Sequence, residues 1–290
     1  MSLPKFEYIR AKSLEEAANL KAELAETAVI YNGGTDVIPL LTARVWQPDY
    51  VIDIKEIPEL DKLTYTEGEG LRIGCLVKLS DVEDSALIKE KMPAVQQAAH
   101  YVASRQIRCK GTMAGNICNA SPSCDTAPIE IAMNAVYTIV SSTDGEKEIE
   151  AKDFFKGVKK TCLAQNEVLK EIFIPELKEG EGSAYFKHAI RKAMDLAIIG
   201  VAAWVKMNNG IIEDVRFAVG GAATTPVRAY EAEEILKGQA YSDELLEKAA
   251  QAAADAVKPI SDVRASAEYR RDMVRVFTKR AFRKAMADIR

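Results

Sequence analysis

The sequence has few histidines, no long apolar run and no excess of positive charge. Its two histidines, His100 and His188, are 88 residues apart, so Ser-His-Asp and Cys-His catalytic sets have little support. The net charge of −4 leaves no basic stripe for nucleic-acid binding. No apolar run reaches ~18 residues, and no apolar signal-peptide core opens the chain. These absences predict a cytoplasmic protein that neither spans a membrane nor binds nucleic acid.

Cysteine is also scarce, and its spacing is irregular. The five cysteines are Cys75, Cys109, Cys118, Cys124 and Cys162. An odd number without framework spacing predicts reduced thiols. Three of them lie in the run 109–125, CKGTMAGNICNASPSCD, which lacks the paired C-x2-C of zinc sites and the spacing of common ferredoxins. We therefore expect no metal site, and a loop that lies against a ligand is favoured over a cysteine-held cluster.

Local patterns predict alternating strands and helices in the first fifty residues. A helix is expected over 14–24, with Ser13 as its N-cap and Glu16 completing a capping box. Apolar strands are expected at 28–31 and 50–54. This order is typical of a βαβ unit.

The rest of the chain divides at the charged, glycine-bearing run 176–182. The part before it, from residue 63, is rich in strand patterns. After it, Asn208-Asn209-Gly210 between two apolar stretches predicts a β-hairpin, because Asn and Gly tolerate positive φ. Three helices are expected to follow, near 229–236, 243–257 and 266–289. With 290 residues, 48% of them apolar, the chain should fold into more than one domain.

The segment Val29–Asp36, VIYNGGTD, runs from a predicted strand into two adjacent glycines. Gly33 and Gly34 allow backbone N–H groups to converge and a ligand to approach closely. A plain tight turn is the alternative, and the segment matches neither G-x-G-x-x-G nor the P-loop pattern. If the glycines serve ligand approach, a side chain at Gly34 should obstruct the ligand more than it disturbs the fold.

A second loop of small residues is Gly111–Asn116, GTMAGN, and Asp125 closes the segment that contains it. Backbone N–H groups suit the anionic centre of a dinucleotide, and short Asp, Asn and Thr side chains suit its sugar hydroxyls. Lys187 is a further candidate for contact with a ligand, with an ordinary solvated lysine as the alternative.

The two loops resemble the flavin-binding signatures of the FAD (medium) subunit of the molybdenum hydroxylases, the xanthine dehydrogenase and carbon monoxide dehydrogenase family. The first motif of that family is typically A-G-G-T-D, and Asn32–Asp36 reads NGGTD. The second is typically T-I-G-G-N, and Thr112–Asn116 reads TMAGN. Further matches are KAMDLAIIGVAA at 192–203, GGAATTPVRAYEAE at 220–233 and YRRDMVRVFTKRAF at 269–282. The resemblance covers nearly the whole chain in family order.

This resemblance implies an α+β fold. A two-lobed flavin-binding domain of the vanillyl-alcohol-oxidase type would occupy 1–176, with lobes at about 1–57 and 58–176. A C-terminal domain of the molybdenum hydroxylase flavoprotein type, a sheet with three helices, would fill 177–290. FAD is expected in the cleft between these parts.

The resemblance also implies which residues hold the FAD. Val29–Asp36 would wrap the diphosphate, and Thr112–Asn116 would form the opposing wall. Asp125 would bond a hydroxyl or an adenine-side group, and Ser104 would lie near the flavin. The predicted cofactor-binding residues are Val29, Ile30, Tyr31, Asn32, Gly33, Gly34, Thr35, Asp36, Ser104, Thr112, Met113, Ala114, Gly115, Asn116, Asp125, Leu169 and Lys187.

One residue departs from the second motif. Ala114 stands where the family has its first glycine. If that position requires positive φ, the alanine costs about 1 kcal/mol.

The implied function is that of an FAD-dependent oxidoreductase subunit. It would relay electrons from an iron–sulfur partner to an acceptor such as NAD⁺. The implied partners are a small two-iron, two-sulfur subunit and a large molybdopterin subunit. A self-contained flavin oxidoreductase and a redox-inactive nucleotide-binding assembly module stay open as alternatives. The substrate of the complex is not readable, because that chemistry would lie on the large subunit.

Overall fold

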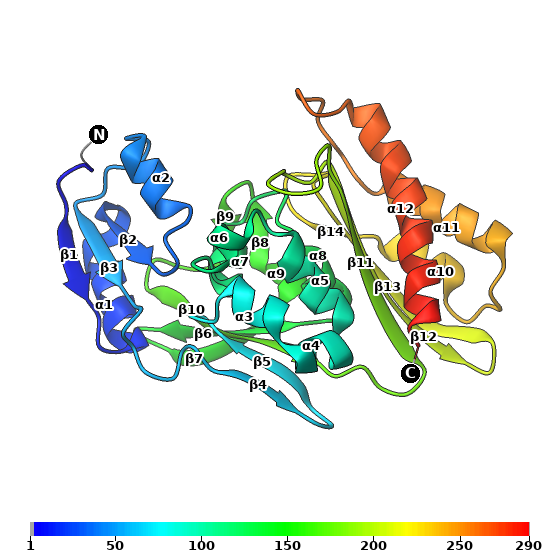
Figure 1. The fold of residues 1–290 in the computed structure, drawn as a ribbon, viewed down its shortest axis with the longest axis horizontal. Coiled ribbons are helices and arrows are strands. Elements are labelled where there is room, and N and C mark those ends of the chain that lie inside the picture. Colours follow the sequence, from blue (N-terminus) through cyan, green and yellow to red (C-terminus); the bar gives the residue numbers. More distant parts are fainter. Residues whose placement is uncertain (1–2, 290) are drawn as a thin grey trace.

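The structure is a computed structural model, and it describes residues 3–289. Its first lobe is a three-stranded parallel sheet in the order β1-β3-β2, with helices packed on it (Figure 1). The elements of this lobe are β1 (Glu7–Arg10), α1 (Leu14–Leu24), the 3-10 helix η1 (Ala25–Thr27), β2 (Ala28–Tyr31), α2 (Val37–Thr42) and β3 (Tyr50–Asp53). The predicted helix over 14–24 and the strands at 28–31 and 50–54 are confirmed within a residue.

Helix α1 begins at its predicted N-cap. The Oγ of Ser13 accepts a hydrogen bond from the N–H of Glu16, at 3.1 Å. The Glu16 carboxylate, however, accepts from the N–H of Lys12 at 2.7 Å. Only half of the predicted capping box therefore forms.

The second lobe is built on a five-stranded antiparallel sheet in the order β4-β5-β10-β6-β7. Its strands are β4 (Leu63–Thr66), β5 (Gly70–Gly74), β6 (Val136–Ser141), β7 (Gly145–Glu150) and β10 (Glu167–Pro175), with a small hairpin of β8 (Phe155–Gly157) and β9 (Lys160–Thr161). Its helices are α3 (Leu79–Asp84), α4 (Ala86–Lys91), α5 (Pro93–Tyr101), α6 (Arg105–Arg108), α7 (Met113–Cys118), α8 (Ala127–Ala132) and α9 (Ala151–Phe154). Of the five strands of this sheet, β10 comes last in the sequence but lies at the centre.

A four-stranded antiparallel sheet in the order β11-β12-β13-β14 forms the C-terminal part. Its elements are β11 (Glu181–His188), β12 (Ile199–Asn208), β13 (Ile211–Gly220), β14 (Val227–Arg228), α10 (Tyr230–Leu236), α11 (Asp243–Asp255) and α12 (Ala267–Ala287). The predicted hairpin is confirmed, because Asn209 and Gly210 join β12 to β13 with φ of 49° and 81°. The three predicted helices are also present.

The C-terminal sheet is covered on both faces. Helix α12 packs on β11 and β12, whereas α5 and α8 of the second lobe contact the same sheet. Accordingly, Tyr185 and Trp204 belong to the apolar core shared with the two lobes, while Phe217 and Phe282 belong to a separate C-terminal core. The domain boundary at 176–177 stays a prediction.

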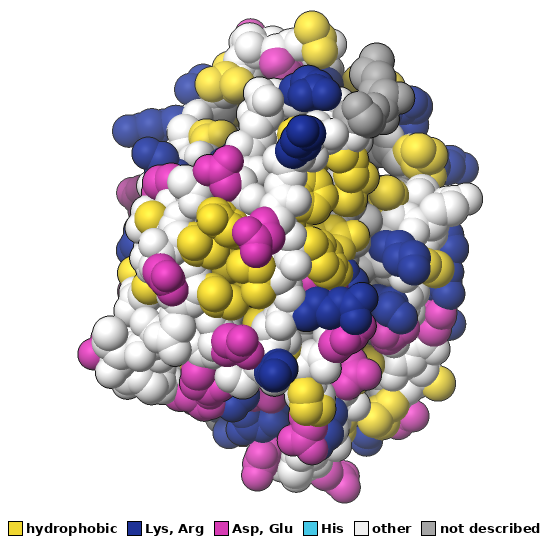
Figure 2. Space-filling view, turned by 90° about the vertical axis from the view of Figure 1, so that its left-hand side faces the viewer, with side chains coloured by type: hydrophobic (Ala, Val, Ile, Leu, Met, Phe, Trp, Pro, Cys, Tyr) yellow, Lys and Arg dark blue, Asp and Glu magenta, His cyan; other side chains and the backbone are white. Residues whose placement is uncertain are grey.

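The first lobe carries several exposed apolar side chains. Among them are Tyr8, Ile38, Val45 and Trp46. Figure 2, which looks onto this end of the molecule, shows hydrophobic side chains gathered in the middle of the face with acidic and basic ones around them. Within residues 3–289, none of the helices is long and apolar enough to cross a bilayer.

Candidate functional site

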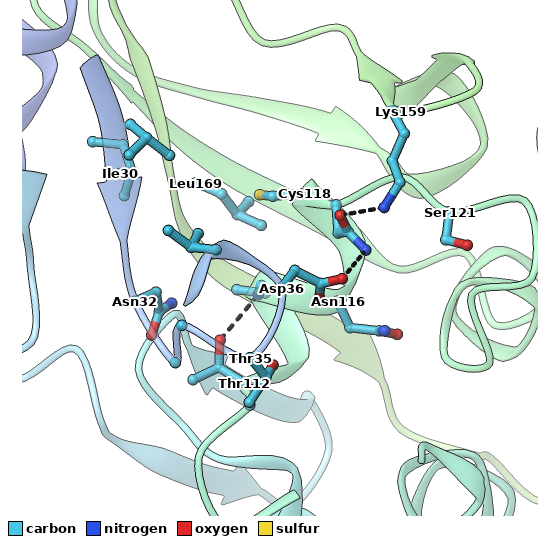
Figure 3. Close-up of a pocket in the computed structure, with 18 of the residues that line it drawn as sticks. Ile30, Asn32, Thr35, Asp36, Thr112, Asn116, Cys118, Ser121, Lys159 and Leu169 are labelled. Carbon is cyan, nitrogen blue, oxygen red and sulfur yellow. Dashed lines mark hydrogen bonds between the residues drawn. The ribbon is translucent and has the colours of Figure 1, made fainter. Parts of the chain in front are cut away.

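A cavity of about 1250 Å³ is lined by both lobes and by the loop before β12 (Figure 3). From the first lobe come most of 28–37 and the segment 45–48. From the second lobe come residues of 111–125 and of 163–169. The loop before β12 contributes Met194, Asp195 and Leu196. Sequence segments that lie far apart in the chain thus meet around one space.

Most residues predicted to hold the cofactor line this cavity. Those that do are Val29, Ile30, Asn32, Gly33, Gly34, Thr35, Asp36, Thr112, Ala114, Gly115, Asn116, Asp125 and Leu169. Tyr31, Ser104, Met113 and Lys187 are outside the lining. The side chain of Met113 is fully buried in the core, so a contact of this residue with the cofactor would be made by its backbone and stays a prediction.

Two predicted residues outside the lining have other partners. The ring of Tyr31 packs under the ammonium group of Lys55, 3.7 Å from the ring centre. Ser104 caps helix α6, where its Oγ accepts a bond from the N–H of Ile107. Both residues therefore support the walls of the cavity from behind.

The glycine loop of the first lobe is shaped by contacts inside the protein. A β-carbon on Gly33 would lie 2.3 Å from the carbonyl oxygen of Lys110, and one on Gly34 would lie 2.3 Å from the ring of Tyr31. Gly34 also has φ of 73°. A side chain at Gly34 would therefore strain the fold as well, while its larger effect on the ligand stays a prediction.

The second loop is the start of helix α7. The Oγ1 of Thr112 accepts from the N–H of Gly115 at 3.0 Å, which fixes the first turn. Ala114 lies inside this helix and is not among the residues with positive φ. The strain expected from alanine at this position is therefore absent. Asn116 faces the cavity, and its Oδ1 accepts from Thr126 at 3.0 Å and from the Cys124 thiol at 2.9 Å.

Asp125 is the centre of a buried polar group at the edge of the cavity. Its carboxylate accepts from the Nζ of Lys187 at 2.8 Å and from the hydroxyl of Tyr185 at 3.0 Å. Lys187 also donates to the carbonyl oxygen of Tyr101 at 3.0 Å. Burial raises the pKa of Asp125 to about 6, although Lys187 and Tyr185 oppose that rise. Lys187 thus reaches the cavity through Asp125, which lines it.

Sequence reasoning missed the loop before β12. The N–H of Met194 donates to the carbonyl oxygen of Ala103, and the Oγ of Ser123 donates to that of Ala197. These bonds tie the loop to the second lobe, so that it closes one end of the cavity. The motif KAMDLAIIGVAA contains this loop, but no feature of its residue types indicates a position against a ligand.

The cysteines are dispersed around the cavity and the second lobe. Cys118 has exposed surface and lines the cavity, and desolvation by the surrounding protein raises the pKa of its thiol to about 12. Burial raises the pKa of Cys124 to about 12 as well. Such thiols stay protonated at neutral pH. Across residues 3–289, no group of three or more His, Cys, Asp or Glu side chains is placed to hold a metal ion.

A buried carboxyl lies behind the Asn116 wall. Glu130, on α8, has no exposed surface and accepts from the hydroxyl of Tyr137 at 2.5 Å. Among the described residues, its Oε1 has no hydrogen-bond partner. Burial raises the pKa of Glu130 to about 8, against the hydrogen bonds with Tyr137 and Thr126. The group is therefore largely protonated in the folded protein at neutral pH.

Stability should consequently depend on pH through Glu130. Its pKa is raised in the folded state, so its contribution is complete below about pH 4.5 and is lost as the pH rises through about 8. Within that window the loss approaches about 1.4 kcal/mol per pH unit. In urea unfolding of the unliganded protein at pH 5, 6.5 and 8, Glu130→Gln should flatten the decline of the free energy of unfolding with rising pH. Glu148→Gln, an exposed change on β7, should leave it unaltered. Parallel profiles for all three proteins would contradict the buried-acid assignment.

Two sequence families match the chain in turn. Residues 4–177 match the family described as FAD binding domain in molybdopterin dehydrogenase, and residues 184–285 match the CO dehydrogenase flavoprotein C-terminal domain. The chain belongs to the FAD subunits of the molybdenum hydroxylases. The predicted family is confirmed.

Relatives of this FAD subunit match it from end to end. It is 36% identical over 280 residues to the glyceraldehyde dehydrogenase medium chain of Sulfolobus acidocaldarius, covering 97% of this chain and 98% of the relative. It is 34% identical over 281 residues to the xanthine dehydrogenase FAD-binding subunit of Escherichia coli O157:H7, covering 97% and 96%.

Solved structures agree with the predicted α+β fold of this FAD subunit. Carbon monoxide dehydrogenase from Hydrogenophaga pseudoflava, in a form that lacks the Mo-pyranopterin moiety of the molybdenum cofactor, aligns with a TM-score of 0.94 at 33% identity, covering 99% of both chains. Quinoline 2-oxidoreductase from Pseudomonas putida 86 aligns with a TM-score of 0.89 at 26% identity, also covering 99% of both chains.

The cavity of the FAD subunit fits its cofactor. Its volume of about 1250 Å³ exceeds the range of about 300–1,000 Å³ typical of drug-sized ligands, as a dinucleotide requires. Hydrogen-bonding groups such as Asn32, Thr35 and Asn116 line its middle. Apolar side chains, among them Val102, Met194 and Leu196, line the end next to the C-terminal sheet and suit a flat ring. The cofactor is FAD.

Proposed function

We propose that this chain is the electron-transfer subunit of a molybdenum hydroxylase complex, passing electrons from an iron–sulfur partner to an acceptor such as NAD⁺. Two observations together support the proposal. The chain has a cavity large enough for FAD, and its described residues form no group that could hold a metal ion. Bound FAD supplies both one-electron exchange with a cluster and hydride exchange with a nicotinamide.

The residues of this chain would bind and orient the cofactor. We assign the diphosphate to the loops 29–36 and 112–116, because these bring small residues and hydrogen-bonding groups to the middle of the cavity. Asp125, held by Lys187 and Tyr185, would accept a hydrogen bond from a hydroxyl of the cofactor. The loop at 194–196 would shield the ring from water.

The proposed partners are a small two-iron, two-sulfur subunit and a large molybdopterin subunit. Three relatives are named medium chains, one of glyceraldehyde dehydrogenase and two of carbon monoxide dehydrogenase. A medium chain implies other chains in the same complex. Genes for such chains beside the gene for this one would support the assignment.

The purified chain should contain stoichiometric FAD, and anaerobic NADH should bleach the flavin absorbance. If dithionite bleaches the flavin but NADH does not, the electron acceptor is a compound other than NAD⁺. Turnover of a small substrate by the isolated chain would favour a self-contained oxidoreductase. A colourless protein that cannot be reconstituted with FAD would contradict electron transfer and support an assembly module.

A further inference from the structure

The cavity holds an anionic cofactor although its lining is acidic. Its described lining residues include no arginine and no histidine, and two lysines, Lys21 and Lys159, face five carboxylates. The carboxylates are those of Glu26, Asp36, Asp125, Glu167 and Asp195. Three of these carboxylates are paired with cations outside the lining, Asp125 with Lys187, Glu167 with Lys147 and Asp195 with Arg191. The FAD diphosphate adds further negative charge that the lining must offset. One of the two lysines is therefore expected to lie near the diphosphate.

Lys21 is in the wrong place for this task. Its Nζ donates to the carbonyl oxygen of Ala25 at the end of α1, at 2.9 Å. This end of α1 lies next to the start of strand β2, whereas the glycine loop follows the end of that strand. The four residues of β2 span about 13 Å at ~3.3 Å per residue. Lys21 thus lies toward the opposite end of the cavity from Gly33 and Gly34.

Lys159 reaches the glycine loop through a short chain of hydrogen bonds. Its Nζ donates to the Oδ1 of Asn119 at 2.6 Å, and the Nδ2 of Asn119 donates to the Oδ1 of Asp36 at 3.1 Å. Figure 3 shows Lys159 extending from its hairpin toward Asp36, with both bonds dashed. Asp36 is the last residue of the NGGTD motif. The bridge therefore spans from the second lobe to the glycine loop of the first.

The backbone holds Lys159 in an unusual conformation that aims it this way. Lys159 lies in the two-residue turn between β8 and β9 and has φ of 57°, which non-glycine residues adopt at a cost of about 1 kcal/mol. Its N–H donates to the carbonyl oxygen of Ala120 at 3.0 Å, just beyond α7. Two-residue hairpin turns commonly require this conformation. The hairpin thus fixes the lysine against the loop that contains Asn119.

We propose that Lys159 is the cation that neutralises the diphosphate of bound FAD. Without FAD, its ammonium group is held by Asn119 on the line to Asp36. With FAD bound, the same group pairs with a diphosphate oxygen, and Asn119 keeps the turn and Asp36 in register. The inference rests on FAD binding to this cavity and adds a cofactor-binding residue outside both glycine motifs.

The test is FAD titration of the full chain after removal of its cofactor, at 50, 150 and 500 mM salt. Lys159→Met should weaken FAD binding by about 5- to 30-fold at 50 mM salt, because a partly exposed charge-assisted bond is lost. The difference should shrink to about twofold at 500 mM, since salt screens exposed charges. Lys159→Arg should stay within about threefold of the wild type.

The neighbouring Lys160 provides the matched control. It is exposed and lies on β9, so Lys160→Met changes the net charge equally. That variant should bind FAD within about twofold of the wild type at every salt concentration. If both variants lost the same FAD affinity, the effect would come from net charge alone, and the proposal would be overturned. Lys159→Met could instead weaken FAD binding equally at every salt concentration and lower the melting temperature of the FAD-free protein. Lys159 would then have a structural role only, and the proposal would be overturned.

Discussion

Gly33→Val should abolish measurable FAD binding and also destabilise the FAD-free protein. The new β-carbon would lie 2.3 Å from the carbonyl oxygen of Lys110 and 2.8 Å from the Cα of Gly111. Both atoms belong to the backbone, so neither can move aside as a flexible side chain would. The two loops that enclose the cavity must therefore separate. We expect FAD affinity to fall by at least about 100-fold and the free energy of unfolding to fall by about 1–3 kcal/mol.

FAD titration and urea unfolding of the FAD-free protein measure these two effects separately. Gly157→Ala is the matched control, because its β-carbon would meet nothing nearer than the Cβ of Lys160 at 3.9 Å. Gly157 is also absent from the residues with positive φ. The control should keep both properties close to those of the wild type. Wild-type affinity in Gly33→Val would show that the contact between the loops is dispensable.

Lys187→Met should cause the second large effect, a loss of about 3–5 kcal/mol in the free energy of unfolding at pH 8. Both side chains of the Lys187–Asp125 pair are only 7% exposed. Without the ammonium group, the Asp125 carboxylate would keep a single hydrogen bond, from Tyr185. Its pKa, already raised to about 6 by burial, would rise further. The loss should therefore be smaller at pH 5, where the carboxyl takes up a proton.

The double variant Asp125→Asn/Lys187→Met should recover most of this stability, since no buried charge remains. Lys62→Met, which breaks an exposed pair with Glu59, should leave the free energy of unfolding nearly unchanged. All measurements use the FAD-free protein, so a direct contact of Lys187 with the cofactor would not contribute. If the single variant is no less stable than the wild type at pH 8, the buried pair is not a structural requirement.

Local structure was largely readable from the sequence, because each signal acts over a few residues. Ser13 predicts the start of α1 through its own hydroxyl, and Asn209-Gly210 predicts a hairpin through the positive φ that these residues tolerate. The glycine motifs likewise predict a ligand site, and most of their residues line the cavity. Family resemblance extended these motifs to FAD.

Long-range features were not readable, because they depend on which distant residues meet. The two glycines of NGGTD indicate close approach of something to the backbone. Only the structure shows that Lys110 and Tyr31 are among the approaching groups. The sequence predicts that Lys187 binds the cofactor, but it does not indicate that the Nζ of Lys187 also bonds Asp125, 62 residues earlier in the chain. Lys159 carries no motif and became visible only through its bridge to Asn119.

The central position of β10 has a consequence for synthesis on the ribosome. Strands β4 and β5 form one antiparallel pair and β6 and β7 another, and β10 alone joins the two. A nascent chain that ends before residue 167 therefore exposes two open strand edges, which favour aggregation. Leu169, on β10, lines the FAD cavity. The cofactor thus meets a complete second lobe only after residue 175 has left the exit tunnel.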